Sequence, residues 1–357
     1  MDASAVNVNV TIDDFDSVLS YADQSVWVTP DPSNPTFDDT NSPWFMGTYH
    51  KTETVDATLS LNFTGPAIYI YGHAGPSYGS YEVQIDSNTS SFSAHAESNA
   101  STPHLLYSAN LPYSAHTLTL RNLGAKDGDA GGNSFLVDYI QITMQVAPAG
   151  ATASNTTYEE DNTALTYSGK WGNNTGPDFS GGGTAFTNED KASVSLSFHG
   201  SAIYLFGDKK NDHGLYSVVL DNQTPVIHSG ISGCGGAFSQ TCEQQKPTLQ
   251  FIAHNLDDSL HTIKIENLAG VNNSFLDIDS FVVTVPSAYS VRDLSGSSSS
   301  SASGSGSSST SSATGTTSAS PSGTNNNSNA ASSMSPWNPL LFLVLAVFWL
   351  VRPSLRR

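Results

Sequence analysis

Basic residues are scarce in this sequence. Its 357 residues include 13 Lys and Arg against 32 Asp and Glu, which gives a formal net charge of −19. A protein that binds a phosphate backbone needs stripes of Lys and Arg, so this balance argues against a nucleic-acid partner. Charged residues are only 13% of the chain, and Ser, Thr, Asn and Gly take the polar positions instead. That composition is more typical of a secreted β protein than of a cytosolic enzyme.

Cysteine is also scarce, with two residues in the whole chain, Cys234 and Cys242. No CxxC spacing and no pair of histidines lies beside them, which argues against a metal site. Two interpretations remain, a local disulfide that closes a Gly-rich loop or two free thiols. We predict the disulfide, and closing so short a loop stabilises a fold by roughly 2–3 kcal/mol.

Sequence motifs of metal-dependent and phosphate-transferring enzymes are absent as well. The chain has no HExxH and no glycine-rich phosphate loop followed by a helix. The glycines at 181–183 precede a predicted strand and are interpreted as a turn. The sequence therefore predicts no catalytic residues and a protein that is not an enzyme.

What the chain does contain is a duplication. Residues 59–72 (LSLNFTGPAIYIYG) match residues 194–207 (VSLSFHGSAIYLFG) position for position at one constant offset. Leu59 and Leu61 alternate with polar residues, as do Val194 and Leu196, and a period of two puts the apolar side chains on one face of a sheet. Each copy predicts a strand, a turn at glycine and a second strand.

The two copies agree along most of their length. Residues 12–21 align with 158–167, and residues 79–89 with 214–224. Residues 116–123 align with 261–268 after an insertion around the cysteines, and the last strands align on Asp138 and Asp279. Many short strands with turn signals and no helical run predict an all-β fold of two tandem antiparallel β-sandwich domains. We predict the first at residues 7–147 and the second at 156–286, and call them the first and second repeat.

The order of AIYIYG, SYEVQID, HTLTLRNL and FLVDYIQI in the first repeat resembles the jelly roll of galactose-binding-like domains, which several carbohydrate-binding modules use. The tandem arrangement with its Ser-rich tail is similar to uncharacterised membrane-anchored surface proteins of fungi. The resemblance implies a non-enzymatic cell-surface protein that presents two modules for glycan binding, cell-wall binding or adhesion. Two alternatives stay open, a structural spacer without a ligand and a glycan-active hydrolase that uses a carboxylate pair.

The C-terminal part changes character. Residues 294–335 are rich in Ser, Thr, Gly and Asn and predict a disordered stalk. Residues 337–351 predict a short apolar membrane segment, whose core is Leu340–Val351. Twelve helical residues span about 18 Å, against about 30 Å of hydrocarbon. A lipid-anchor signal fits the short length, whereas the arginines that follow favour a single membrane span with a cytosolic end.

We expect the protein at a cell surface with both repeats outside the cell. Its first residues, MDASAVNVNV, do not form a signal peptide, and we expect that a leader is missing from this sequence. Acceptor triplets for N-glycosylation support passage through the secretory pathway. Those in the two repeats begin at Asn9, Asn62, Asn88, Asn99, Asn155, Asn173, Asn222 and Asn272.

Carboxylates gather near the predicted ends of the first and last strands of each repeat. These strands commonly lie side by side in a jelly roll, and oxygen ligands suit Ca²⁺. The resemblance to carbohydrate-binding modules implies a structural calcium there, as the one expected cofactor. The alternative is solvated strand ends on an acidic protein. The candidate ligands are Asp13, Asp14 and Asp138 in the first repeat, and Glu159, Glu160 and Asp279 in the second.

Exposed aromatic side chains at the loop end of such a fold are candidates for stacking on a sugar. The candidates are Trp27, Trp44, Tyr78 and Trp171. Trp27 and Trp171 occupy equivalent places in the two repeats, which more often indicates shared packing than shared recognition. Trp44 has no counterpart by this reading, because the second repeat has FSGGGT there. We therefore expect Trp44 to mark a site specific to the first repeat.

Overall fold

Strands make up nearly all of the regular structure of the chain. The computed structural model describes residues 4–126, 131–234 and 242–294. Within these ranges every ladder between strands is antiparallel, and the only helices are four short 3-10 turns. The predicted all-β fold is therefore confirmed. The predicted stalk at 294–335, apart from its first residue, and the predicted membrane segment at 337–351 lie outside the described residues.

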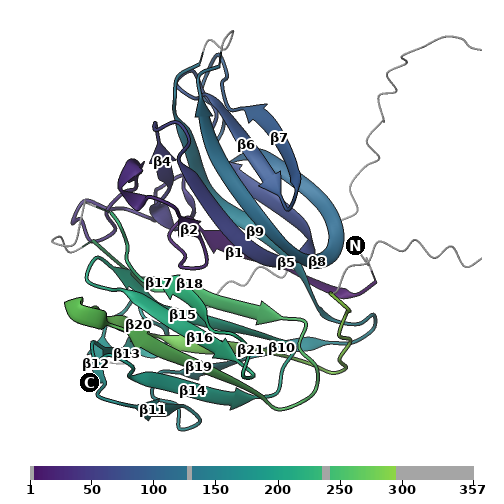
Figure 1. The fold of residues 1–357 in the computed structure, drawn as a ribbon, viewed down its shortest axis with the longest axis vertical. Helices are drawn as coiled ribbons and strands as arrows, with labels where there is room; N and C mark the ends of the chain where they lie inside the picture. Colours follow the sequence, from purple (N-terminus) through teal and green to yellow (C-terminus); the bar gives the residue numbers. More distant parts are fainter. Residues whose placement is uncertain (1–3, 127–130, 235–241, 295–357) are drawn as a thin grey trace, which may run out of the picture. The chain divides into compact units, whose positions relative to one another are not determined.

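The first repeat forms one nine-stranded sheet that folds over on itself (Figure 1). Its main path runs β3-β4-β9-β5-β8-β6-β7, with β1 paired to β9 and β2 paired to β5. The strands are β1 (Val6–Asp13), β2 (Ser20–Tyr21), β3 (Trp27–Val28), β4 (His50–Thr52), β5 (Thr58–Gly72), β6 (Ser80–Ile85), β7 (Asn88–Ser93), β8 (His104–Gly124) and β9 (Phe135–Ala147). The 3-10 turns are η1 (Gln24–Val26) and η2 (Phe45–Gly47).

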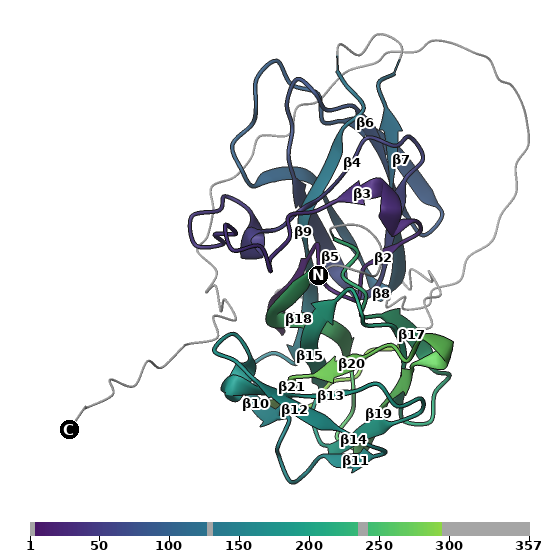
Figure 2. The ribbon, with the colours of Figure 1, turned by 90° about the vertical axis from the view of Figure 1, so that its left-hand side faces the viewer.

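The second repeat divides the same strand order among three sheets, β10-β21-β15-β18, β11-β14-β19-β16-β17 and β12-β13-β20 (Figure 2). Its elements are β10 (Ala153–Glu159), β11 (Thr166–Ser168), β12 (Gly172–Thr175), η3 (Ser180–Gly182), β13 (Gly183–Thr187), β14 (Ser193–Phe198), β15 (Ala202–Lys210), β16 (Leu215–Leu220), β17 (Val226–Ser229), β18 (Glu243–His254), β19 (His261–Leu268), η4 (Gly270–Asn272), β20 (Leu276–Ile278) and β21 (Ser280–Pro286).

The matched segments bury their apolar positions as the alternation predicts. Leu59 and Leu61 are 0% and 2% exposed, and Val194 and Leu196 are 0% and 1% exposed. The first repeat differs from the prediction in one detail. Residues 58–72 form a single strand, whereas we predicted two strands joined by a turn at Gly65. The strand takes up the irregularity as a bulge against β8. A side chain at Gly65 would collide with the Thr143 carbonyl, so glycine lets the backbones approach.

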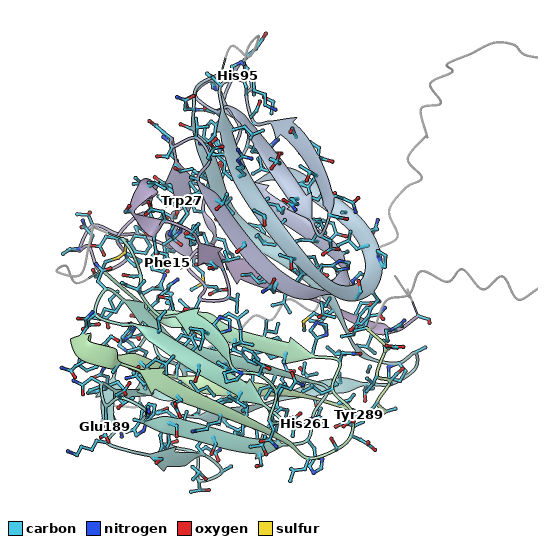
Figure 3. The ribbon with its side chains drawn as sticks, viewed as in Figure 1. Phe15, Trp27, His95, Glu189, His261 and Tyr289 are labelled. Atoms are coloured by element: carbon cyan, nitrogen blue, oxygen red, sulfur yellow. A yellow bond between two sulfur atoms is a disulfide. The ribbon has the colours of Figure 1, made fainter. Side chains whose placement is uncertain are left out.

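Hydrogen bonds that fix the turns recur in both repeats. The Tyr21 hydroxyl donates to the Asp14 carbonyl oxygen at 2.8 Å, and the Tyr167 hydroxyl donates to the Glu160 carbonyl oxygen at 2.8 Å. Each repeat also contains an Asp–His pair, Asp86 with His116 inside β8 and Asp221 with His261 at the start of β19. Figure 3 labels His261. The two repeats therefore share local contacts as well as sequence.

Contacts also join the two repeats. The Leu249 amide donates to Asp16 Oδ1 at 2.7 Å, and Gln24 Nε2 donates to the Ser232 carbonyl oxygen at 2.7 Å. Cys234 and Cys242 form the predicted disulfide and are buried against Phe15 of the first repeat. The insertion that distinguishes the second repeat thus serves as a contact with the first.

Candidate functional site

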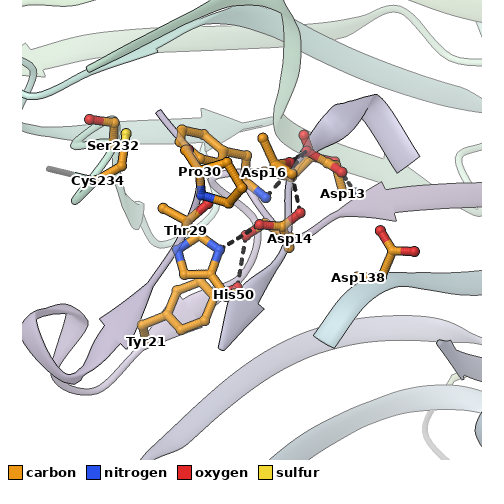
Figure 4. Close-up of polar contacts among 12 residues, drawn as sticks. Asp13, Asp14, Asp16, Tyr21, Thr29, Pro30, His50, Asp138, Ser232 and Cys234 are labelled. Atoms are coloured by element: carbon orange, nitrogen blue, oxygen red, sulfur yellow. Dashed lines mark hydrogen bonds and ion pairs between the residues drawn. The ribbon is translucent and has the colours of Figure 1, made fainter. Parts of the chain in front are cut away.

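The predicted carboxylate group of the first repeat does assemble. Asp13 ends β1, Asp14 follows it, Asp138 lies in β9, and all three are at most 1% exposed. The Thr48 hydroxyl donates to Asp14 Oδ1 at 2.8 Å, and His50 Nδ1 lies 2.6 Å from Asp14 Oδ2 (Figure 4). Burial raises the pKa of Asp13 well above its usual value, and the charges of Asp16 and Asp138 raise it further. These groups are held in the interior and are not solvated strand ends.

A buried lysine from the second repeat faces this group. Lys209 is 3% exposed, and its ammonium lies 5.8 Å from the centre of the Phe15 ring. Burial lowers the pKa of Lys209 to about 8, although the charges of Asp16, Asp14 and Asp13 oppose this effect. Burial also lowers the pKa of His50 well below its usual value, and the charge of Lys209 adds to this effect.

The second repeat brings together the equivalent carboxylates. The Ser180 hydroxyl donates to Glu159 Oε1 at 3.1 Å, and the Ser180 amide donates to Asp279 Oδ2 at 3.2 Å. In the first repeat the Phe45 amide donates to Asp138 Oδ1 in the same way, at 2.9 Å. Burial raises the pKa of Asp279 to about 8, and the charge of Glu159 adds to the effect. Burial raises the pKa of Glu160 as well.

Part of this geometry fits a calcium ion. Four of the carboxylates have one buried oxygen with no hydrogen-bond partner among the described residues, and such oxygens are ligands that Ca²⁺ prefers. They are Asp13 Oδ1, Asp138 Oδ2, Glu159 Oε2 and Asp279 Oδ1. Yet no three acidic side chains of the described ranges bring one oxygen each within 4.8 Å of one another. A calcium ion would therefore need backbone carbonyls or water as further ligands, and the calcium site stays a prediction.

A second group of metal-type side chains, formed by Asp31, Cys234 and Cys242, has its ligand atoms within 4.8 Å of one another. Both sulfurs belong to the disulfide. They are not thiolates that could bind a metal, so this group is not a metal centre.

Two of the four predicted aromatic candidates serve packing. Trp27 is 4% exposed and meets Tyr21 edge to face, with ring centroids 5.2 Å apart (Figure 3). Trp171 meets Tyr167 in the same manner, at 4.9 Å. Trp27 is therefore not available to a sugar, which corrects its place among the ligand candidates. The recurrence at equivalent positions reflects a shared contact.

The other two candidates belong to one aromatic group in the first repeat. Trp44 and Tyr78 both contact His73, with ring centroids 5.7 Å and 5.2 Å from it. Tyr49 also packs on Trp44, with ring centroids 4.9 Å apart. Tyr78 is only 7% exposed, so Trp44 is the more accessible of the two predicted rings.

Three further rings, which we did not predict, adjoin this group along the chain, since Phe45 follows Trp44 and Tyr71 lies two residues before His73. Phe45 is 40% exposed and packs on Tyr139, whose ring centroid lies 5.4 Å away. Tyr139 in turn stacks on Tyr71, and both are half-buried. The alternation in AIYIYG could have indicated Tyr71, since it points away from buried Ile70. We call Trp44, Phe45, Tyr71, His73, Tyr78 and Tyr139 the aromatic cluster.

Trp44 does have a counterpart, contrary to the sequence alignment. Trp44 and Phe179 each precede a 3-10 turn, η2 and η3, and the two turns hold equivalent places. Phe179 is 3% exposed. The position is aromatic in both repeats, and it was missed because the glycines of the second repeat hide the similarity of the turns.

The second repeat carries different chemistry at the other positions of the cluster. The constant offset of the matched strands places Asp208 where the first repeat has His73, and His213 where it has Tyr78. His213 Nδ1 lies 3.4 Å from Asp208 Oδ1, and both residues are at most 5% exposed. Burial raises the pKa of Asp208 well above its usual value, and the charges of Asp277 and Glu243 add to this.

A cavity of about 800 Å³ lies beside His213. Its lining residues come from the turn after β15, from the end of β17 and from the segment between β19 and β20. The second repeat thus has a hollow lined by a histidine at the position where the first repeat has Tyr78.

Comparison with known proteins gave one curated relative. No family model matches the chain. The relative is the "A type blood alpha-D-galactosamine galactosaminidase" of Flavonifractor plautii, which is 25% identical over 268 residues. The match covers 74% of this chain and 22% of the relative, so the chain spans about a fifth of the relative's length. The matched length exceeds that of either repeat alone.

Solved structures that resemble part of this chain include carbohydrate-related proteins. They include a family 35 carbohydrate-binding module from Clostridium thermocellum, which is 12% identical with a TM-score of 0.27 over 36% of this chain and 98% of the module. A mannanase with such a module from Podospora anserina is 20% identical, with a TM-score of 0.25 over 38% of this chain and 28% of that one. At these TM-scores we draw nothing further from them.

The curated relative corrects one expectation. From the sequence we predicted a non-enzymatic surface protein, whereas the relative is named a galactosaminidase, which is an enzyme. The prediction relied on missing sequence motifs, and residues that act on a substrate can come from distant parts of a chain without forming a local motif.

Proposed function

We propose that this chain is glycan-active and works on glycans that carry galactosamine, as the name of its curated relative indicates for that protein. The observation that supports the proposal is the aromatic cluster of the first repeat. A sugar ring presents a face of C–H groups, which packs on an aromatic ring. Phe45, at 40% exposed, and the half-buried pair Tyr71 and Tyr139 offer such rings on one face of the sheet.

Polar groups adjoin these rings on the same sheet face. Tyr71 pairs in register with Tyr139, and Tyr69 pairs in register with Gln141. Residues at such paired positions point to the same side. The phenol hydroxyl groups and the Gln141 amide can therefore donate to or accept from sugar hydroxyls. This combination of apolar rings and a few polar groups is typical of sites for small polar ligands.

The buried carboxylates of the two repeats do not form a catalytic pair that a sugar could reach. Glycoside hydrolysis uses two carboxyl groups roughly 5–10 Å apart that flank the sugar bond. Asp13, Asp14, Asp138, Asp208 and Asp277 are all at most 2% exposed. We therefore assign glycan engagement to the aromatic cluster, and leave cleavage of the sugar bond to be measured directly.

The test measures two quantities on the full chain, binding to glycans that end in α-linked galactosamine and release of galactosamine from them. We expect saturable binding that Phe45→Ala weakens. Leu260→Ala is the matched control, because Leu260 is 61% exposed in the turn before β19 and its loss should leave binding unchanged. A chain that neither binds nor cleaves such glycans would contradict the proposal.

We also propose the extracellular, membrane-attached location and the two-domain division expected from the sequence. All eight predicted acceptor asparagines of the repeats are exposed, which supports modification in a secretory pathway. Within the described ranges no helix has both the length and the apolar character needed to cross a membrane. The predicted attachment depends on Leu340–Val351, so deleting that segment and following the protein between membrane and soluble fractions is the test.

A further inference from the structure

We propose that the cavity of the second repeat binds a sugar unit that carries a free amino group, in preference to its N-acetyl form. The inference rests on the proposed function and names a second site, distinct from the aromatic cluster, together with the chemical class that it takes. It is carried by the cavity of about 800 Å³ and by the charge of its lining.

The cavity has the size and the groups that a sugar needs. Pockets for small ligands commonly measure 300–1,000 Å³ and combine apolar walls with a few polar groups. Phe275 and Leu215 supply apolar surface, and Ser229, Asn273 and Ser274 supply hydroxyl and amide groups. Phe186 contacts Phe275, with ring centroids 6.0 Å apart, and so limits its movement.

A single carboxylate sets the charge of the cavity. Asp212 is the one formally charged side chain among the described lining residues, which include neither Lys nor Arg. His213 adds no positive charge at neutral pH, because burial and the charge of Lys210 lower its pKa to about 3. A positively charged ammonium group on a sugar complements this negatively charged lining, whereas an acetamido group is neutral and does not.

The first repeat provides an internal comparison. The constant offset places Ser77 at the position of Asp212, and Tyr78 at the position of His213. Tyr78 and His213 make equivalent bridges, to Ser134 and to Phe275. The same place is therefore neutral and aromatic in one repeat and acidic in the other. The two repeats have the same backbone arrangement at this place but different side chains. Binding of two different sugar groups would require such a difference.

The test is a calorimetric titration of the full chain, prepared without N-glycans because Asn272 at the cavity is a predicted acceptor. The probes are methyl α-D-galactosaminide and its N-acetyl form. We expect roughly fivefold tighter binding of the amino sugar, the scale of a charge pair in contact with water, and a smaller preference at high salt. Asp212→Asn should remove the preference.

Asp258→Asn is the matched control, since Asp258 is exposed in the turn between β18 and β19, at the far end of β19 from the cavity. It should leave the preference intact. Equal binding of both probes, or a preference that Asp212→Asn does not change, overturns the inference. If binding persists but is lost only in Phe45→Ala, the proposed function stands and this inference fails. If no glycan binds at all, both fail.

Discussion

Tyr71 stacks on Tyr139 across the β5–β9 ladder, with ring centroids 4.5 Å apart and planes inclined by 21°. Neither ring belongs to the hydrophobic core, whose neighbouring members are Ile70 and Ile140. An aromatic pair on the outer face of a sheet contributes less to burial than a core residue does. Its position beside Phe45 makes it the part of the molecule that best suits contact with a sugar.

Removing one ring of this pair should weaken glycan binding. We expect Tyr139→Ala to lower affinity by about fivefold to tenfold, since one aromatic contact contributes about 1–1.5 kcal/mol. Tyr139→Phe keeps the ring and should retain most of the affinity. Tyr289→Ala removes a partly exposed ring just after the last strand of the second repeat (Figure 3) and serves as the control. Equal affinity in all three variants would show that the stacked pair does not contact the glycan.

Core and surface positions of β14 should differ sharply in their effect on stability. Leu196 is 1% exposed, so Leu196→Ala should lower the free energy of unfolding by about 2–5 kcal/mol. Ser197 lies next to it on the exposed face, and Ser197→Ala should change that free energy by less than about 0.5 kcal/mol. Denaturant titration of both variants measures the difference. Similar effects at both positions would contradict the assigned register.

The repeated tyrosine hydrogen bonds should contribute similarly in the two repeats. Tyr21→Phe and Tyr167→Phe each remove one hydroxyl that donates at 2.8 Å to a backbone carbonyl oxygen. We expect each change to lower the free energy of unfolding by about 1 kcal/mol. Thermal unfolding by calorimetry compares them directly. A large loss of stability for one variant and none for the other would show that the two hydrogen bonds contribute unequally to the free energy of unfolding.

Acid should weaken the contact between the repeats at His254. His254 Nε2 lies 2.9 Å from the Thr64 carbonyl oxygen, and burial lowers the pKa of His254 to about 4. The unfolded chain, with an ordinary histidine, binds this proton first, so stability falls as pH drops from about 6.5 to about 4. The difference between the pKa of His254 in the unfolded chain, about 6.5, and in the folded chain, about 4, corresponds to about 3 kcal/mol of lost stability.

His254→Gln cannot take up the proton, so its stability should depend less on pH over that range. Urea unfolding at pH 4.5 and pH 7, with wild type beside the variant, isolates the contribution of this side chain. An equal pH dependence in both proteins would refute the assignment.

Calcium should stabilise the chain if its ligands are the four buried carboxylate oxygens that lack a hydrogen-bond partner among the described residues. We expect heat on addition of Ca²⁺ and a higher melting temperature, both reduced in Asp138→Asn and Asp279→Asn. Asp258→Asn changes the same charge at an exposed position and should leave both quantities unchanged. No heat and no shift in melting temperature would end the calcium prediction.

The sequence was sufficient for what depends on local pattern. The period-two alternation around Leu61 and Leu196 predicted buried strand faces, and the duplication predicted matching elements in both halves. The disulfide followed from the scarcity of cysteine. Each of these depends on residues that are close along the chain, so composition and spacing were enough.

The accessible site had to come from the tertiary structure. Phe45 and Tyr139 are far apart in sequence and meet only because η2 folds against β9. Trp27 and Trp44 are the same residue type, yet packing buries Trp27 and leaves Trp44 partly exposed. Whether a ring is core or surface depends on which strands close around it, and that is settled by contacts between distant residues rather than by any property of the ring itself.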